Sequence, residues 1–224
     1  MILAFDTSGP HCAAALVRGD RVLAHRHEPM KKGQAEALMP LIADMMETEG
    51  LTPADLAAIG VGTGPGNFTG LRIAVSAARG MALALGVPAI GVTGFEIMRG
   101  GHCPQAATPQ LVSLPGPRGT AYVQPFGGGA AVGPPRQIDP ADPPADLELP
   151  EGGEVLGHEA AAIAYGLASD AHPRPAVLLD YALPLARSAM AKFATGQSFP
   201  RPAPLYVRAA DAAPSRQAAP VILE

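Results

Sequence analysis

A glycine-rich loop between an apolar run and a helical pattern constrains this chain more than any other feature. It extends from Gly62 to Arg72, follows the apolar residues 58–61 and leads into an alanine-rich helical pattern. Because glycine has no Cβ, the N–H groups of such a loop can face one point, and a helix N-terminus behind it favours an anion. The loop matches neither the dinucleotide fingerprint nor the Walker P-loop. It therefore predicts a close approach, by an anion, by another backbone or by the strand beneath its own helix.

Composition limits the classes of function. The 224 residues are 48% apolar, enough for one large domain or two small ones with a real core. No apolar run reaches the roughly 18 residues of a membrane span, and no basic start precedes an apolar segment, so we expect neither a membrane helix nor a secretory signal. The cysteines, Cys12 and Cys103, are isolated, which predicts free buried thiols and a cytoplasmic protein.

The charge balance argues against a chain that binds nucleic acid by itself. The formal net charge is −4, and the aromatic residues are four tyrosines and six phenylalanines without a tryptophan. Proteins that bind nucleic acid alone usually have a basic face and stacking aromatic side chains. If the chain serves RNA chemistry, we expect another protein to make most of the contacts with RNA.

The first hundred residues have the pattern of an α/β domain with a mixed sheet. Three strands joined by turns come first, and helices then alternate with strands. The capping box at Thr52–Asp55 predicts one helix start. The predicted strands are 2–6, 12–17, 21–27, 58–61 and 88–92, and the predicted helices are 34–49 and 71–85.

The rest of the chain has a different composition. Only six of the 25 prolines fall in residues 1–100, which predicts two sub-domains, 1–100 and a smaller, proline-rich 101–224. The predicted strands here are 110–114 and 120–126, and the predicted helices are 159–168 and 181–194, the latter interrupted at Pro184. Residues 209–224 are rich in alanine and proline and read as a loose tail.

The two helices of the first half have more apolar surface than one core requires. At 100° per residue, the apolar residues of helix 34–49 cover about 200°, where a core-facing stripe needs about 100°. On helix 71–85 small residues recur every four positions and allow another helix to approach closely. Burial inside the domain explains such surfaces, and so does a shared interface with a partner or a second copy. The candidate interface residues are Leu38, Met39, Ile42, Met45, Met46, Ser76, Gly80 and Ala84.

Asp6, Thr7 and Ser8 are the first candidates for chemistry, because they end the first strand. A carboxylate there can hold a metal-bound water and the hydroxyls can meet phosphate, but a turn that satisfies its own backbone needs the same residues. The turn Leu114–Gly119 lacks the second acid that phosphoryl transfer requires. His25 and His27 lie on one strand face without a third ligand, which predicts solvated histidines and no metal site. These residues form no catalytic set.

Two segments resemble the signatures of the TsaB (YeaZ) family, residues 2–8 and the loop 64–72 with its phenylalanine and arginine. Supporting matches are 38–42, 89–93, 118–123 and 204–208. The resemblance implies a two-domain actin/Hsp70/sugar-kinase fold of the ribonuclease H-like type, with the second sub-domain reduced. It also implies a role in threonylcarbamoylation of N6 of the adenosine 3′ to the anticodon in tRNA. In that family TsaB is the non-catalytic paralogue of TsaD, and the ATPase TsaE joins them.

The resemblance also assigns roles to residues. Asp6, Thr7, Ser8, Gly64 and Gly66 would form a degenerate nucleotide site, and the pairing surface would be the first two helices. The family loop comprises Gly64, Pro65, Gly66, Phe68, Thr69, Gly70 and Arg72. We expect no cofactor bound firmly by this chain, since ATP and metal would belong to TsaD and TsaE. A homodimer is expected when TsaD is absent, with tRNA bound only through the complex.

Two positions depart from the family pattern. Gln34 stands where many relatives have histidine, and Pro115–Pro117 where they have a polar turn. Both departures weaken a claim that this chain binds nucleotide alone. The alternatives are an ATP-dependent phosphotransferase of the same fold that uses Asp6 and the glycine loop, and a metallohydrolase. The missing second acid argues against the first, and the missing histidine pair against the second.

Overall fold

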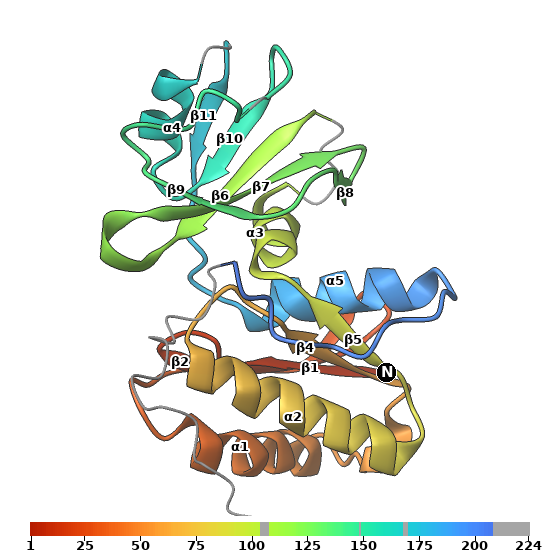
Figure 1. The fold of residues 1–224 in the computed structure, drawn as a ribbon. Coiled ribbons are helices and arrows are strands. Elements are labelled where there is room, and N and C mark those ends of the chain that lie inside the picture. The colour runs from red at the N-terminus through yellow and green to blue at the C-terminus, as the bar shows by residue number, and fades with distance from the viewer. Residues whose placement is uncertain (104–107, 148, 168–169, 208–224) are drawn as a thin grey trace, which may run out of the picture.

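The computed structural model describes residues 1–103, 108–147, 149–167 and 170–207. It contains two β-sheets, one above the other in Figure 1, with helices on the faces of the first and a small helical layer on the second. The predicted tail 209–224 lies outside the described residues.

The first sheet has the strand order β3-β2-β1-β4-β5. Its first three strands run antiparallel, and β4 and β5 add in parallel beside β1. This is the order of the ribonuclease H-like fold, as expected. The strands are β1 (Ile2–Asp6), β2 (His11–Arg18), β3 (Arg21–Pro29), β4 (Ala58–Gly62) and β5 (Ala89–Val92).

Helices cover both faces of this sheet (Figure 1). On one face lie α1 (Gln34–Thr48) and α2 (Phe68–Leu85), and on the other lies α5 (Ala182–Ala194), which also contacts α3 (Gly94–His102). The predicted division at residue 100 does not account for this packing, because α5 comes after it. α5 is also continuous: Pro184 lies in its first turn, where a proline removes no helical hydrogen bond.

The second sheet is mixed and has the order β11-β10-β6-β7-β8, with β9 paired to β7. The predicted strands 110–114 and 120–126 are β6 (Gln110–Pro115) and β7 (Ala121–Gly127). Between this sheet and α4 (Ala160–Gly166) lies another apolar core, in addition to those on the two faces of the first sheet. α4 is shorter than predicted. The remaining elements are β8 (Ala130–Ala131), β9 (Arg136–Ile138), β10 (Glu154–Gly157), β11 (His172–Pro175) and the 3-10 turns η1 (Pro53–Asp55) and η2 (Pro117–Gly119).

α2 begins three residues earlier than predicted. The Asn67 side chain accepts a hydrogen bond from the Gly70 N–H, which caps the helix at Phe68, and Gly86 ends it in the left-handed region at φ 68°. The capping box at Thr52–Asp55 is present, but it opens only the turn η1.

The apolar composition of α2 has a structural cause. The helix has 18 residues with a mean hydropathy of 1.2, so its length and composition alone would allow it to cross a membrane. Ala74, Val75 and Ala78 pack into the core against the first sheet, and Arg72 and Arg79 lie on the exposed side. This is the pattern of a helix that covers a sheet.

Candidate functional site

Asp6 ends β1 in a buried hydrogen-bond network. Its Oδ1 accepts from the Ser8 N–H at 2.9 Å and from the Ser8 hydroxyl at 2.8 Å, and it lies 2.7 Å from His11 Nε2. The carboxylate is 1% exposed. Its Oδ2 has no hydrogen-bond partner within the described part of the chain and lies where a Cβ on Gly62 would be. Asp6 therefore stabilises its own turn instead of facing an open cleft.

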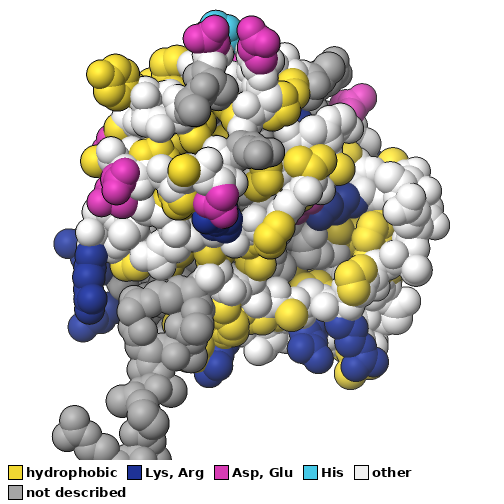
Figure 2. Space-filling model, turned by 45° about the horizontal axis from the view of Figure 1, so that its top comes forward, with side chains coloured by type: hydrophobic (Ala, Val, Ile, Leu, Met, Phe, Trp, Pro, Cys, Tyr) yellow, Lys and Arg dark blue, Asp and Glu magenta, His cyan; other side chains and the backbone are white. Residues whose placement is uncertain are grey.

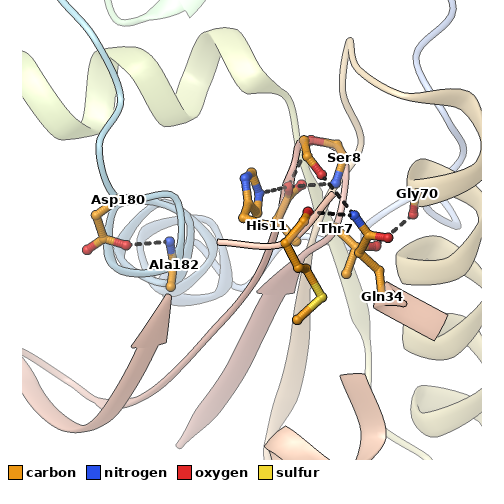
Figure 3. Close-up of polar contacts among 10 residues, drawn as sticks. Thr7, Ser8, His11, Gln34, Gly70, Asp180 and Ala182 are labelled. Atoms are coloured by element: carbon orange, nitrogen blue, oxygen red, sulfur yellow. Dashed lines mark hydrogen bonds and ion pairs between the residues drawn. The ribbon is translucent and has the colours of Figure 1, made fainter. Parts of the chain in front are cut away.

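The glycine loop packs directly on the turn that follows β1. The Thr7 hydroxyl donates to the Gly70 carbonyl at 2.7 Å, and the Asn67 N–H donates to the Ser8 carbonyl at 2.7 Å. Figure 3 shows Thr7 and Gly70 facing each other across this contact. A Cβ at Gly70 would collide with the Thr7 carbonyl, and one at Gly66 would lie 2.6 Å from the Ser8 carbonyl. The glycines at these two positions allow one backbone to lie against another.

The same loop also fixes the start of α3. The Gly64 carbonyl accepts from the Gly94 N–H at 2.7 Å, and Gly64 adopts a φ of 91° that favours glycine. Asp6, Thr7, Ser8 and Gly64 are all buried. The residues predicted to form a degenerate nucleotide site thus come together, but they are in contact with one another.

Sequence reasoning missed His11, which belongs to the hydrogen-bond network of Asp6. Its ring lies 5.1 Å from that of His27 on β3 and 4.4 Å from that of Tyr181, just before α5. Burial lowers the pKa of His27, to which neighbouring His11 adds, and burial raises the pKa of Tyr181. The antiparallel register of β2 and β3, with Ala13 opposite His27, was a signal that could have predicted the contact between the two histidines. No local signal could have predicted the contact with Tyr181, because it is distant in the sequence.

The prediction of solvated strand histidines is correct only for His25, whose side chain is 37% exposed. His27 Nε2 is buried without a hydrogen-bond partner in the described structure, and His25 Nε2 lies 2.9 Å from the Asp180 carboxylate. Asp180 in turn accepts from the Ala182 N–H at the start of α5 (Figure 3). Among the described residues no group of three His, Cys, Asp or Glu side chains could hold a metal ion.

A groove of about 710 Å³ lies beside the glycine loop, between the starts of α1 and α2. Lys31 and Lys32 line it together with Gln34. Gln34 Nε2 donates to the Met30 carbonyl at 3.1 Å and lies 3.5 Å from the Gly9 carbonyl, as Figure 3 shows in part. Gln34 therefore ties the start of α1 to the turn after β1.

The structure divides the predicted interface residues into two groups. Leu38, Ile42, Met45 and Met46 are at most 5% exposed and belong to the core between α1, α2 and the sheet. Their assignment to an interface was wrong, because the chain itself covers them. Met39, Ser76, Gly80 and Ala84 are exposed, and Met39 has an exposed fraction of 47%.

We call the exposed residues Ser76, Gly80 and Ala84 the α2 ridge. A Cβ on Gly80 would have nothing within 4 Å, so the space above the ridge is open. Leu83, which is 83% exposed, stands beside it. The ridge is flat, apolar at its edge and accessible to another helix.

Residues 199–206, here called the strap, run from the C-terminal end of α2 past β5 to the N-terminal end of α2. The Leu205 N–H donates to the Thr63 carbonyl at 2.7 Å. The Tyr206 ring stacks on Phe68 at 5.5 Å, and its hydroxyl accepts from Arg72 Nε at 3.2 Å. Since the Arg72 guanidinium also lies over the Phe68 ring at 3.7 Å, two residues of the family loop hold the strap on α2.

Comparisons with known proteins agree with this architecture. The family model of TsaD, tRNA N6-adenosine threonylcarbamoyltransferase, matches residues 23–124. The TsaB protein of Escherichia coli K12, a tRNA threonylcarbamoyladenosine biosynthesis protein, is 34% identical over 122 residues, which are 54% of this chain and 52% of that protein. That of Bacillus subtilis 168 is 36% identical over 97 residues, 43% of this chain and 42% of that protein.

The chain is similar to the TsaB proteins over about half of its length. It spans about half the length of the curated TsaB relatives that it matches. A solved structure of YeaZ, another name for TsaB, from Pseudomonas aeruginosa has a TM-score of 0.72 and 22% identity, and the match covers 92% of this chain and 98% of that one. At that identity the likeness shows the same fold.

The TsaB signature can now be read on the structure. Gly66 and Gly70 close the loop on the turn after β1, whereas Phe68 and Arg72 face outward and hold the strap. The turn Pro117–Gly119, where phosphoryl transfer would require a second acid, has Arg118 at a φ of 55° and no acid. In this chain the loop Gly64–Arg72 therefore combines buried contacts with the turn after β1 and exposed side chains that hold the strap.

Proposed function

We propose that the chain is the non-catalytic subunit that pairs with TsaD, and with TsaE, for threonylcarbamoylation of N6 of the adenosine 3′ to the anticodon in tRNA. The TsaB relatives are named as tRNA threonylcarbamoyladenosine biosynthesis proteins. ATP and metal are assigned to the partner proteins, and no cofactor is bound firmly by this chain. The modification of tRNA places the chain in the cytoplasm.

The α2 ridge is the observation that carries this proposal. Small side chains at every fourth position let a partner helix come close, and helix axes pack at about 8–10 Å depending on the side chains between them. The ridge is exposed, Cβ space at Gly80 is open, and Met39 and Leu83 offer adaptable apolar contacts beside it. A second copy uses the same ridge when TsaD is absent, and tRNA is reached only through the complex.

The closed turn after β1 supports a non-catalytic role. A phosphotransferase of this fold needs Asp6 to face a metal-bound water, but here its Oδ1 is occupied by Ser8 and His11. The Thr7 hydroxyl and the Ser8 carbonyl are both used in hydrogen bonds to the glycine loop. The phosphotransferase alternative therefore requires the loop to leave contacts that are buried.

Co-purification of this chain with TsaD from the same genome tests the proposal. We expect a stable complex whose threonylcarbamoyl transfer activity depends on this chain. Gly80→Leu is expected to weaken pairing, whereas Ala191→Leu, an exposed substitution on α5 across the sheet, is expected to pair normally. Failure of the unsubstituted chain to bind TsaD would reject the proposed function. ATP turnover by the pure chain that Asp6→Asn abolishes would favour the phosphotransferase.

A further inference from the structure

A second exposed feature continues from the α2 ridge at its C-terminal end. A groove of about 510 Å³ lies between the end of α2 and the strap, and we call it the arginine groove. Gly80 and Leu83 line both the ridge region and this groove. Arg79 comes from α2 and Arg201 from the strap, and apolar lining is provided by Leu83, Val87 and Phe199.

The two arginines have no acidic partner in the described structure. None of the ion pairs within 4.0 Å among the described residues includes Arg79 or Arg201. From residue 56 to residue 95 the sequence contains no Asp or Glu, and the strap contains none either. Both side chains belong to exposed residues. The groove therefore combines an apolar lining with two arginines that form no ion pair within 4.0 Å among the described residues.

We propose that the arginine groove binds an apolar segment bearing carboxylates that belongs to the same partner protein that pairs on the α2 ridge. This inference rests on the proposed function and adds the chemistry of the partner. Apolar side chains of the segment would contact Leu83 and Phe199, and its carboxylates would meet Arg79 and Arg201. Arginine is the cation best suited to such contacts because its planar fork can bind a carboxylate through two parallel hydrogen bonds.

A second copy of this chain fits the groove less well. A symmetric dimer brings the same patch of both copies together, so a groove-to-groove contact would place four arginines near one another. Like charges across an interface oppose association, and opposite charges accelerate it. The acidic partner and a second copy of this chain can both use the α2 ridge, but the charge of the arginine groove favours the acidic partner.

RNA also carries negative charge, but the rest of the molecule does not favour it. The formal net charge is −4. On the face of the molecule drawn in Figure 2, Asp and Glu side chains lie mainly over the upper part and Lys and Arg side chains mainly over the lower part. The apolar lining of the groove at Leu83 and Val87 offers a phosphate backbone no contact. A carboxylate-bearing protein segment uses both properties of the groove.

The experiment compares two double variants with the same formal charge. In the groove variant Arg79→Glu is combined with Arg201→Glu, and in the control variant Arg18→Glu is combined with Arg187→Glu, two exposed arginines outside the groove. The rate of association with TsaD of the same genome is measured at about 50 mM and about 500 mM salt, since exposed charges are screened within a few ångströms at high salt. A third chain with Arg79→Gln and Arg201→Gln removes the charge without reversing it.

We expect the groove variant to associate about tenfold more slowly than the control variant at low salt, with the glutamine variant between them and the difference largely lost at high salt. Equal rates for the groove and control variants would overturn the inference. So would an effect of the groove variant on tRNA binding or on self-association without an effect on TsaD. If Gly80→Leu blocks pairing while the groove variant matches its control, the proposed function stands and only this inference fails; no pairing by the unsubstituted chain rejects both.

Discussion

Gly80→Leu separates the stability of the monomer from pairing more sharply than any other single substitution on α2. Gly80 is exposed, lies in the interior of α2 and has open space where a Cβ would project. Leucine is favoured over glycine inside a helix by roughly 0.8 kcal/mol. For a chain of this length, each kcal/mol shifts the melting temperature by about 2–4 °C. We therefore expect the variant to melt about 2–3 °C higher than the unsubstituted chain.

Pairing should change in the opposite direction. Four extra heavy atoms on the α2 ridge would hold a partner helix away, and overpacking of a close contact costs about 1–3 kcal/mol. That corresponds to about 5- to 150-fold weaker binding, at 1.4 kcal/mol per factor of ten. Thermal unfolding of the isolated chain and sedimentation equilibrium with TsaD measure the two quantities on the same samples. The reasoning would be refuted by unchanged affinity, which places the partner elsewhere, or by a lower melting temperature, which means that the space above Gly80 is occupied.

Three further predictions address the buried site. Gly70→Ala should destabilise the fold by about 2–3 kcal/mol, because its Cβ would collide with the Thr7 carbonyl; an unchanged urea midpoint would show that the two loops separate freely. Burial lowers the pKa of His27 below its ordinary value of 6.5, so the unfolded state takes up a proton before the folded state as the pH falls through 6.5, and the free energy of unfolding should fall with the pH. His27→Gln should reduce this dependence of the unfolding free energy on pH. An identical pH profile for the variant and the unsubstituted chain would contradict the lowered pKa of His27. Burial, with Glu28 and Asp6 adding to it, raises the pKa of Cys12 to about 11, so a thiol reagent at pH 8 should modify it only after unfolding, and rapid labelling of the folded chain at this residue would be inconsistent with the structure.

Regular elements of the first sub-domain were predictable because their signals are local. Strand β1 follows from a short apolar run and helix α1 from apolar periodicity, and both lie within a residue or two of the predicted bounds. The start of α2 was missed because Phe68–Gly70 continue a glycine-rich loop in composition, while the Asn67 cap already makes them helical. Periodicity identifies a helix reliably and its first turn poorly.

The division of the apolar face of α1 could not be read from the sequence. A broad apolar arc shows that some residues are buried, but which ones depends on where the sheet and α2 lie. Met45 and Met46 point into the core and Met39 does not, although all three are the same residue type on the same helix. For the same reason the cluster of His11, His27 and Tyr181 was not foreseen, since it needs both the hairpin register and the return of α5.

Glycines of α2 and of the loop before it have opposite roles, and this difference bears on the proposed pairing function. Gly66 and Gly70 let the backbone of the glycine loop lie against the turn after β1. Gly80 leaves open space on the exposed side of α2. The first two glycines therefore serve the fold of the monomer, whereas Gly80 serves the proposed pairing. Gly70→Ala should therefore lower stability and leave pairing unchanged at temperatures where the chain stays folded, and Gly80→Leu should raise stability slightly and weaken pairing. The same result for both substitutions would mean that the two sides of α2 are not independent, and the pairing role would then have no separate structural basis.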